Sequence, residues 1–172
     1  MLTRNVTMRS VAGDSLIQRM KKIGSFLRLE FLPSSVDLGL LMLRVWLGAS
    51  MLLLHGWGKA IGGEKLMKNF PDPLGVGNEL SWGLAVFGEV ICAVLLILGL
   101  FTRFAALAGA ITMGVAFFIV HRMVLSGSNS GEMAFIYLAG YVTIFLAGPG
   151  RFALDGKSKS SAPKKVKAVA KD

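Results

Sequence analysis

Two charged side chains lie inside segments that are otherwise apolar and long enough to cross a membrane. Arg44 interrupts the run LGLLMLRVWLGASMLLL, and Glu89 interrupts the run LSWGLAVFGEVICAVLLILGLF. An ionised side chain that faces hydrocarbon costs about 2.5–3.5 kcal/mol even on the most lenient insertion scale. Both residues are therefore expected to face a protein interior, to find a partner or to serve a function.

The composition indicates a membrane protein. Of the 172 residues, 53% are hydrophobic and only 17% are charged, and segments of about 20 apolar residues suit a bilayer core. The short turn Phe101–Arg103 makes the second and third segments antiparallel neighbours, and Ala106, Ala110 and Gly114 allow close helix approach. We predict an all-α, four-helix antiparallel bundle with spans at about 37–59, 79–101, 104–123 and 132–148.

The net charge of +9 is distributed by topology. In the four-span arrangement, fourteen of the 19 basic residues lie on one side of the membrane, and Arg44 lies within a span. The four on the other side are Lys59, Lys65, Lys68 and Arg122. This bias places both termini in the cytoplasm. It also attributes the basic excess to topology and lipid headgroups, so no nucleic-acid partner is expected.

The segments outside the spans are basic. Residues 15–31 carry apolar positions at helical spacing with basic residues between them, which predicts an amphipathic helix in the membrane interface. The same pattern also fits a helix that docks on a partner. The lysine-rich tail 156–172 is expected to be disordered. The single cysteine, Cys92, excludes an internal disulfide and a CxxC relay.

Helical geometry groups the polar residues of the first span. Arg44 and His55 are eleven residues apart, about 20° in helical phase, and Lys59 follows one turn later, so all three are expected on one face. The depths of Arg44 and Glu89 predict an ion pair between them. Such a pair either locks two helices in register or supplies a carboxylate for proton handling beside a redox ligand, which makes Glu89 and Arg44 the catalytic candidates.

A second polar cluster is expected near the outer surface. His55, Lys59 and Trp57 close the first span, His121 closes the third, and Glu132 opens the fourth. These residues either snorkel to the interface or line a pocket beneath the PDPLG loop that binds a small polar or quinone headgroup. Haem ligation by His55 and His121 would require both rings to face one cavity. No motif for a metal site is present.

The ordered segments LRVWLGASMLLLHGWGK, FPDPLGVGNELS, AVFGEVICAVLLILGLFTRFAAL and MAFIYLAGYVTIFLAGPGRFALD resemble the DoxX family of small bacterial membrane proteins over about residues 37–155. The resemblance implies a four-helix bundle of the bacterial inner membrane that serves as an oxidoreductase component, in a family linked to quinol oxidase and thiosulfate:quinone oxidoreductase. The positions that fit the family pattern are Arg44, Gly56, Lys59, Glu89, Gly99, Thr102, Arg103, Glu132, Gly148, Pro149, Gly150 and Asp155.

The leading functional hypothesis is a membrane subunit of a quinone-linked redox system, with Arg44 and Glu89 as its buried polar core. Because no metal, flavin or nucleotide signature is present, electrons would enter through a protein partner or a bound quinone. The competing hypothesis is a non-catalytic membrane factor that assembles, anchors or stabilises partner proteins. The lipid bilayer is expected to surround the chain, and a homo-oligomer is left open.

Overall fold

A computed structural model of the chain describes residues 18–29 and 35–155, and it divides the chain into one unit up to Ser35 and a second from Val36. In the first unit, residues 18–27 are helical, within the predicted range 15–31. This helix exposes Met20, Ile23, Phe26 and Leu27. The remainder of the predicted amphipathic helix, and the basic tail 156–172, lie outside the described residues.

The described part of the second unit consists of helices and loops and contains no β-strand. The first long helix, Val36–Ile61, comprises α2 (Val36–Ser50), η1 (Met51–Gly56) and α3 (Trp57–Ile61), and α4 (Gly63–Lys68) follows it. The second, Asn78–Leu98, comprises α5 (Asn78–Val86), η2 (Phe87–Ile91) and α6 (Cys92–Leu98). The third, Thr102–Val120, comprises α7 (Thr102–Gly114) and η3 (Val115–Val120), and α8 (Glu132–Ala147) is last.

Within the described residues, the three long helices of 26, 21 and 19 residues are long and apolar enough to cross a membrane, whereas α8 is an apolar helix of 16 residues. The second long helix ends three residues before the predicted limit. Gly99 and Phe101 both adopt left-handed backbone conformations, with φ of 71° and 44°. A left-handed residue ends an α-helix, so the chain reverses there and enters α7.

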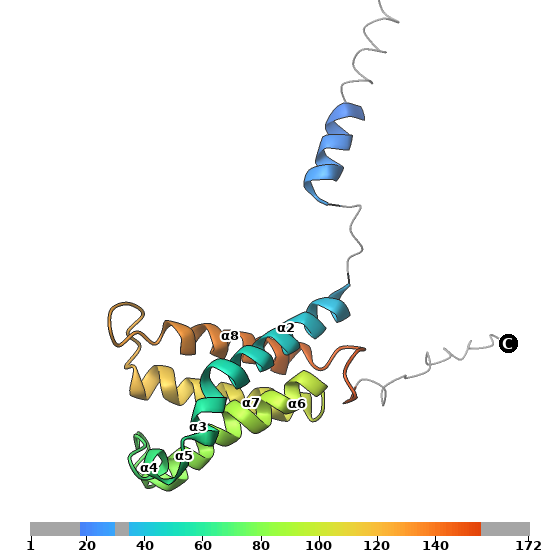
Figure 1. Ribbon diagram of the computed structural model, residues 1–172. Coiled ribbons are helices and arrows are strands. Elements are labelled where there is room, and N and C mark those ends of the chain that lie inside the picture. The colour runs from blue at the N-terminus through green and yellow to red at the C-terminus, as the bar shows by residue number, and fades with distance from the viewer. Residues whose placement is uncertain (1–17, 30–34, 156–172) are drawn as a thin grey trace, which may run out of the picture. The chain divides into compact units, whose positions relative to one another are not determined.

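The four apolar segments pack against one another in a ring: α2 contacts α6 and α8, and α7 contacts α6 and α8 (Figure 1). Their shared interior contains mostly small and medium-sized apolar residues, including Cys92, Ala93, Leu96, Ala105, Ala106 and Ile144, together with the ring of Tyr141. Small side chains let helix backbones approach closely, so the interior is occupied by tight helix contacts.

Two glycines bring the first long helix onto the second. A Cβ at Gly48 would lie 2.8 Å from the carbonyl oxygen of Ala93, and a Cβ at Gly56 would lie 2.6 Å from the carbonyl oxygen of Glu89. No side chain fits at either place without moving a backbone. These contacts set the register of the two helices, with Gly48 level with Ala93 and Gly56 level with Glu89.

Each of the three long helices contains one π-helical segment: η1, η2 and η3. The wider hydrogen bonds are seen from Trp57 N–H to the Leu52 carbonyl and from His121 N–H to the Ala116 carbonyl. A π turn contains an extra residue, so it changes the direction in which all following side chains point. η1 packs against η2, and η3 packs against α8.

The glycine contacts give a first prediction. Gly56→Ala should lower the thermal unfolding midpoint of the purified protein, because the new methyl group would force η1 away from the Glu89 backbone at a cost of about 1–3 kcal/mol. Gly58→Ala is the matched control, since a Cβ at Gly58 has nothing within 4 Å and alanine favours helix. Equal midpoints for Gly56→Ala and the unmodified protein would contradict the close contact.

Candidate functional site

Glu89 pairs with Lys59, and the predicted ion pair between Arg44 and Glu89 is wrong. The Lys59 Nζ donates to Glu89 Oε2 at 2.5 Å and to the His55 carbonyl at 3.2 Å. The Glu89 side chain is only 8% exposed and that of Lys59 27%. A buried carboxylate needs a cationic or hydrogen-bonding partner, and Lys59 supplies both.

Arg44 lies toward the opposite end of the helix pair and is 0% exposed. Its Nη1 donates to the Leu96 carbonyl at 3.3 Å, and the absence of a side chain at Gly99 leaves room for the guanidinium. The Nε and Nη2 groups form no hydrogen bond with any residue in the described ranges. The prediction failed because it measured depth from the span ends, whereas the glycine contacts place Glu89 level with Gly56, about 18 Å along the helix from Arg44.

Asp155 lies close enough to Arg44 for their charges to attract. Burial alone would raise the pKa of the Asp155 carboxyl group. Hydrogen bonds from the amide and hydroxyl of Thr102 and from the amide of Phe101, with the nearby charge of Arg44, outweigh burial and lower this pKa below its ordinary value. The carboxylate therefore stays ionised at neutral pH and stabilises the start of α7.

His55 faces a different helix from Arg44 and Lys59. Its ring meets the Tyr137 ring of α8 edge-on, with 5.4 Å between ring centroids, whereas the side chains of Arg44 and Lys59 contact the second long helix. The π-helical η1 lies between Arg44 and Lys59 and alters the helical phase on which the one-face prediction depended. His55 Nε2 and the Tyr141 hydroxyl are buried without a hydrogen bond to the described residues.

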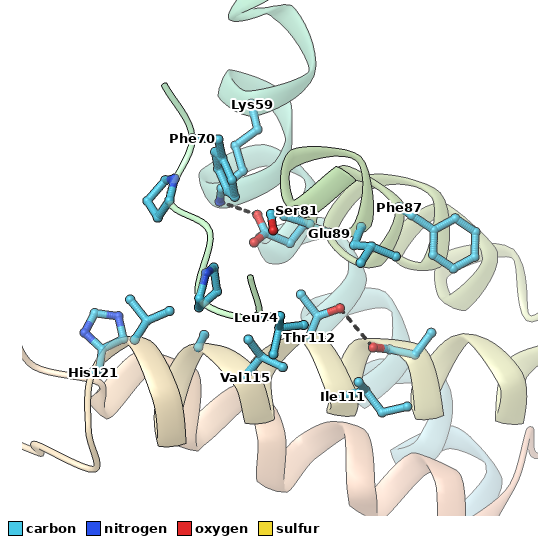
Figure 2. A pocket seen from close by; sticks show the side chains of 17 residues that line it. Lys59, Phe70, Leu74, Ser81, Phe87, Glu89, Ile111, Thr112, Val115 and His121 are labelled. Atoms are coloured by element: carbon cyan, nitrogen blue, oxygen red, sulfur yellow. Dashed lines mark hydrogen bonds and ion pairs between the residues drawn. The ribbon is translucent and has the colours of Figure 1, made fainter. Parts of the chain in front are cut away.

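A cavity of about 500 Å³ lies between the second and third long helices, and Figure 2 shows the Lys59–Glu89 pair at its edge. Its walls come from the segment after α4, from α5 and η2, and from α7 and η3. The lining is mostly apolar, and its residues are Lys59, Phe70, Pro71, Pro73, Leu74, Ser81, Leu84, Ala85, Phe87, Glu89, Ala108, Ile111, Thr112, Val115, Ala116, Val120 and His121.

The cavity contains two of the five predicted binding residues, Lys59 and His121. His55 packs on Tyr137 instead, Trp57 is 55% exposed, and Glu132 is exposed at the start of α8. The two histidines do not line this cavity together, so it does not provide the shared site that haem ligation would require. Two residues of the predicted outer cluster therefore line this cavity, and the other three lie elsewhere.

Part of the PDPLG segment lines the cavity, and Asp72 holds the segment in place. The Asp72 carboxylate accepts hydrogen bonds from the Val76 and Gly77 amides at 3.0 and 2.8 Å and from the Ser81 hydroxyl at 2.7 Å. The bond from Ser81, followed by the bond from Gly77, lowers the pKa of Asp72. The sequence indicates a turn here through its prolines and glycines, but it did not single out Asp72 as the residue that holds the turn.

The cavity offers few polar atoms to a ligand. A lysine ammonium has three N–H donors, and Lys59 uses two, for Glu89 and for the His55 carbonyl. His121 Nδ1 lies 3.2 Å from the Asn129 carbonyl and must carry hydrogen to bond it, so Nε2 is an acceptor in the neutral ring. Ser81 and Thr112 already donate to Asp72 and to the Ala108 carbonyl. The site is therefore suited to an apolar ligand that accepts one strong hydrogen bond.

These features define a helical membrane protein with an apolar cavity beside a buried ion pair. The sequence profile of the DoxX family matches residues 39–122. An uncharacterized protein of Haemophilus influenzae is 34% identical over 118 residues, which cover 63% of this chain and 83% of that protein. A second uncharacterized protein of the same organism is 29% identical over 117 residues, covering 65% of this chain and 76% of its own length. The chain belongs to the DoxX family. No solved structure matches it.

The role of Asp72 gives a second prediction. Asp72→Ala should speed hydrogen exchange at the Val76 and Gly77 amides, because both lose their acceptor. In the unmodified protein the same amides should exchange relatively faster as the pH falls below 3.8, the ordinary carboxyl value. A lowered folded-state pKa means that the stabilisation is present above the unfolded value and is lost as the pH falls through the folded one.

Glu79→Ala is the control for this measurement, since Glu79 is an exposed acid in the first turn of α5. It should leave the Val76 and Gly77 amides unchanged after correction for intrinsic exchange rates. Equal exchange in Asp72→Ala and Glu79→Ala would show that Asp72 does not hold the segment.

Proposed function

We propose that this protein is a four-span subunit of a quinone-linked redox system in the bacterial plasma membrane, with both termini in the cytoplasm, and that the cavity beside Lys59 and Glu89 binds the quinone headgroup. The excess of basic residues on one side of a four-span arrangement supports the topology. Membership of the DoxX family supports a membrane redox role.

The observation that carries the proposal is the combination of an apolar cavity with one uncommitted cationic donor. A quinone ring is flat and apolar and has carbonyl oxygens that accept hydrogen bonds. A volume of about 500 Å³ lies in the range of small-molecule sites. The third N–H of Lys59 would bond one carbonyl, and the apolar side chains of α5 and α7 would enclose the ring. The residues present therefore fit a quinone.

The position of the cavity also suits a ligand that arrives from the bilayer. Leu84, Phe87 and Ile111 line the cavity and are also exposed on the outside of the helices. In a membrane these surfaces would face lipid, so a lipophilic quinone could enter between the second and third long helices without crossing water. A soluble substrate would have no need for such an apolar margin.

A bound quinone would supply reversible two-electron, two-proton redox chemistry. The chain itself would orient the ring through Lys59, exclude water with the segment Phe70–Leu74, and hold a proton-accepting carboxylate, Glu89, at the cavity wall. Glu89 thus stays a catalytic candidate. Arg44 lies toward the other end of the same helix pair, so the proposal gives it no part in ligand binding.

Filling the cavity tests the proposal. In a Trp46→Phe, Trp57→Phe background the remaining tryptophan is Trp82, whose Nε1 donates to the Lys59 carbonyl. A short-chain ubiquinone analogue should quench its fluorescence saturably. Ala116→Phe should weaken this binding about tenfold or more, because the added ring occupies the cavity. Ala139→Phe, on the exposed face of α8, is the matched control.

Equal affinities in Ala116→Phe and Ala139→Phe, or quenching that rises linearly without saturation, would contradict a quinone site in this cavity. Purification in mild detergent separates the competing hypothesis. A stoichiometric protein partner in the absence of quinone would favour the assembly factor, whereas co-extracted quinone lost in Ala116→Phe would favour the redox subunit.

The ion pair gives a further prediction. Lys59→Met should weaken quinone binding by about tenfold to a hundredfold, because a hydrogen bond from a charged donor contributes about 1.5–3 kcal/mol. Lys59→Met should also lower the unfolding midpoint, since Glu89 would remain buried without its partner. The double variant Lys59→Met, Glu89→Gln should regain most of the midpoint but not the affinity. Equal midpoints for the single and double variants would contradict mutual stabilisation of the pair.

A further inference from the structure

A second cavity, of about 590 Å³, lies at the opposite end of the helices from the Lys59–Glu89 pair. It is found where α2 and α7 begin and where α8 ends. Its lining includes two arginines, Arg103 and Arg151, two aspartates, Asp37 and Asp155, and the rings of Phe101 and Phe104. Nothing in the proposed redox function uses this cavity.

The two aspartates are occupied by hydrogen bonds from the chain itself. Asp37 Oδ1 accepts the Arg151 backbone amide at 2.9 Å. Asp155 accepts the Phe101 and Thr102 amides at 3.0 and 2.7 Å and the Thr102 hydroxyl at 2.9 Å. The Asp155 carboxylate, with two amides and a hydroxyl as donors, is already solvated by the protein, and Asp37 accepts one amide. They therefore serve to fix the turn after α6 and the segment after α8.

The two arginines have no such partners. Arg103 Nη2 makes one long hydrogen bond to the Leu146 carbonyl, at 3.4 Å, and neither guanidinium forms an ion pair within the described residues. Both side chains are exposed, and Asp155 at the same cavity also interacts with the buried charge of Arg44. Two guanidiniums at one cavity, with most of their N–H donors uncommitted, are suited to a phosphate group.

The apolar part of the lining indicates where that phosphate comes from. Phe101 and Phe104 are 69% and 57% exposed and flank the arginines at the ends of long apolar helices. A free phosphate ion gains nothing from exposed aromatic rings, whereas a phospholipid places its headgroup among the arginines and its acyl chains beside the rings. Basic pockets between membrane helices recognise anionic headgroups in this way.

We propose that this cavity binds the headgroup of an anionic phospholipid, with Arg103 and Arg151 as its phosphate ligands. The proposal does not depend on the quinone site. The cavity lies at the end of the protein that contains Val36 and Gly148. Lipid binding there would add a specific contact with the headgroup layer to the general attraction of the basic segments.

The test uses the full-length chain in detergent, titrated with phosphatidylglycerol and followed by native mass spectrometry. Parallel titrations use phosphatidylcholine with the same acyl chains, and inorganic phosphate. Phosphatidylglycerol should bind at least fivefold more tightly than phosphatidylcholine. Arg103→Gln and Arg151→Gln should each lower its affinity about fivefold, as expected for one phosphate-facing charge. Arg122→Gln, an exposed arginine beyond η3, is the charge-matched control and should leave the affinity unchanged.

Arg103→Lys and Arg151→Lys keep the positive charge but lose the planar guanidinium, so they should bind phosphatidylglycerol more tightly than the Gln variants and more weakly than the unmodified protein. Equal phosphatidylglycerol binding by Arg103→Gln, Arg151→Gln and Arg122→Gln would overturn the proposal. So would equal affinity for the two lipids. Saturable binding of inorganic phosphate as tight as that of phosphatidylglycerol would replace the lipid by a free anion.

Discussion

A charge in an apolar interior needs a partner, and this need determines the arrangement at one end of the protein. Lys59 and Glu89 meet this requirement for each other and so join α3 to η2. Two neighbouring contacts depend on the same alignment: the close approach of Gly56 to the Glu89 carbonyl and the bond from Trp82 Nε1 to the Lys59 carbonyl. With the first two long helices aligned in this way, the segment Phe70–Leu74 and the second and third long helices line the cavity together.

The buried charge of Arg44, on the same pair of helices, is stabilised in a different way. α6 ends at this level, so the Leu96 carbonyl has no hydrogen-bond donor from within the helix. It accepts one bond from the Arg44 guanidinium and one from the amide of Gly99, which follows the helix. The carbonyl ends of a helix carry partial negative charge, which favours a cation there. Arg44 therefore marks the end of α6 rather than its middle, and it is close to Asp155 rather than to Glu89.

Much of the fold follows from the pattern of apolar residues. The four apolar ranges coincide with the four helical segments within three residues at each end, because the length of an apolar segment can be read from the sequence.

Which residues line the cavity was only partly predictable. Lys59 and His121 were found from their places at helix ends, but the directions of side chains after Met51 depend on π turns, which leave no periodic signal in the sequence. The prediction of an Arg44–Glu89 pair was wrong for a related reason. The contacts of Gly48 and Gly56 set the register of the two helices, and the sequence does not distinguish a glycine at a helix contact from any other glycine.

Both cavities follow one electrostatic arrangement. At each, carboxylates are committed to the chain: Glu89 to Lys59, and Asp37 and Asp155 to backbone amides. What remains uncommitted is a cationic donor, the third N–H of Lys59 at one end and the guanidiniums of Arg103 and Arg151 at the other. A single ammonium beside apolar walls selects a ligand with an isolated acceptor atom, whereas two guanidiniums select a group with several negative oxygens. The difference in donor geometry is therefore what leads us to assign a quinone to one end of the helices and an anionic phospholipid to the other.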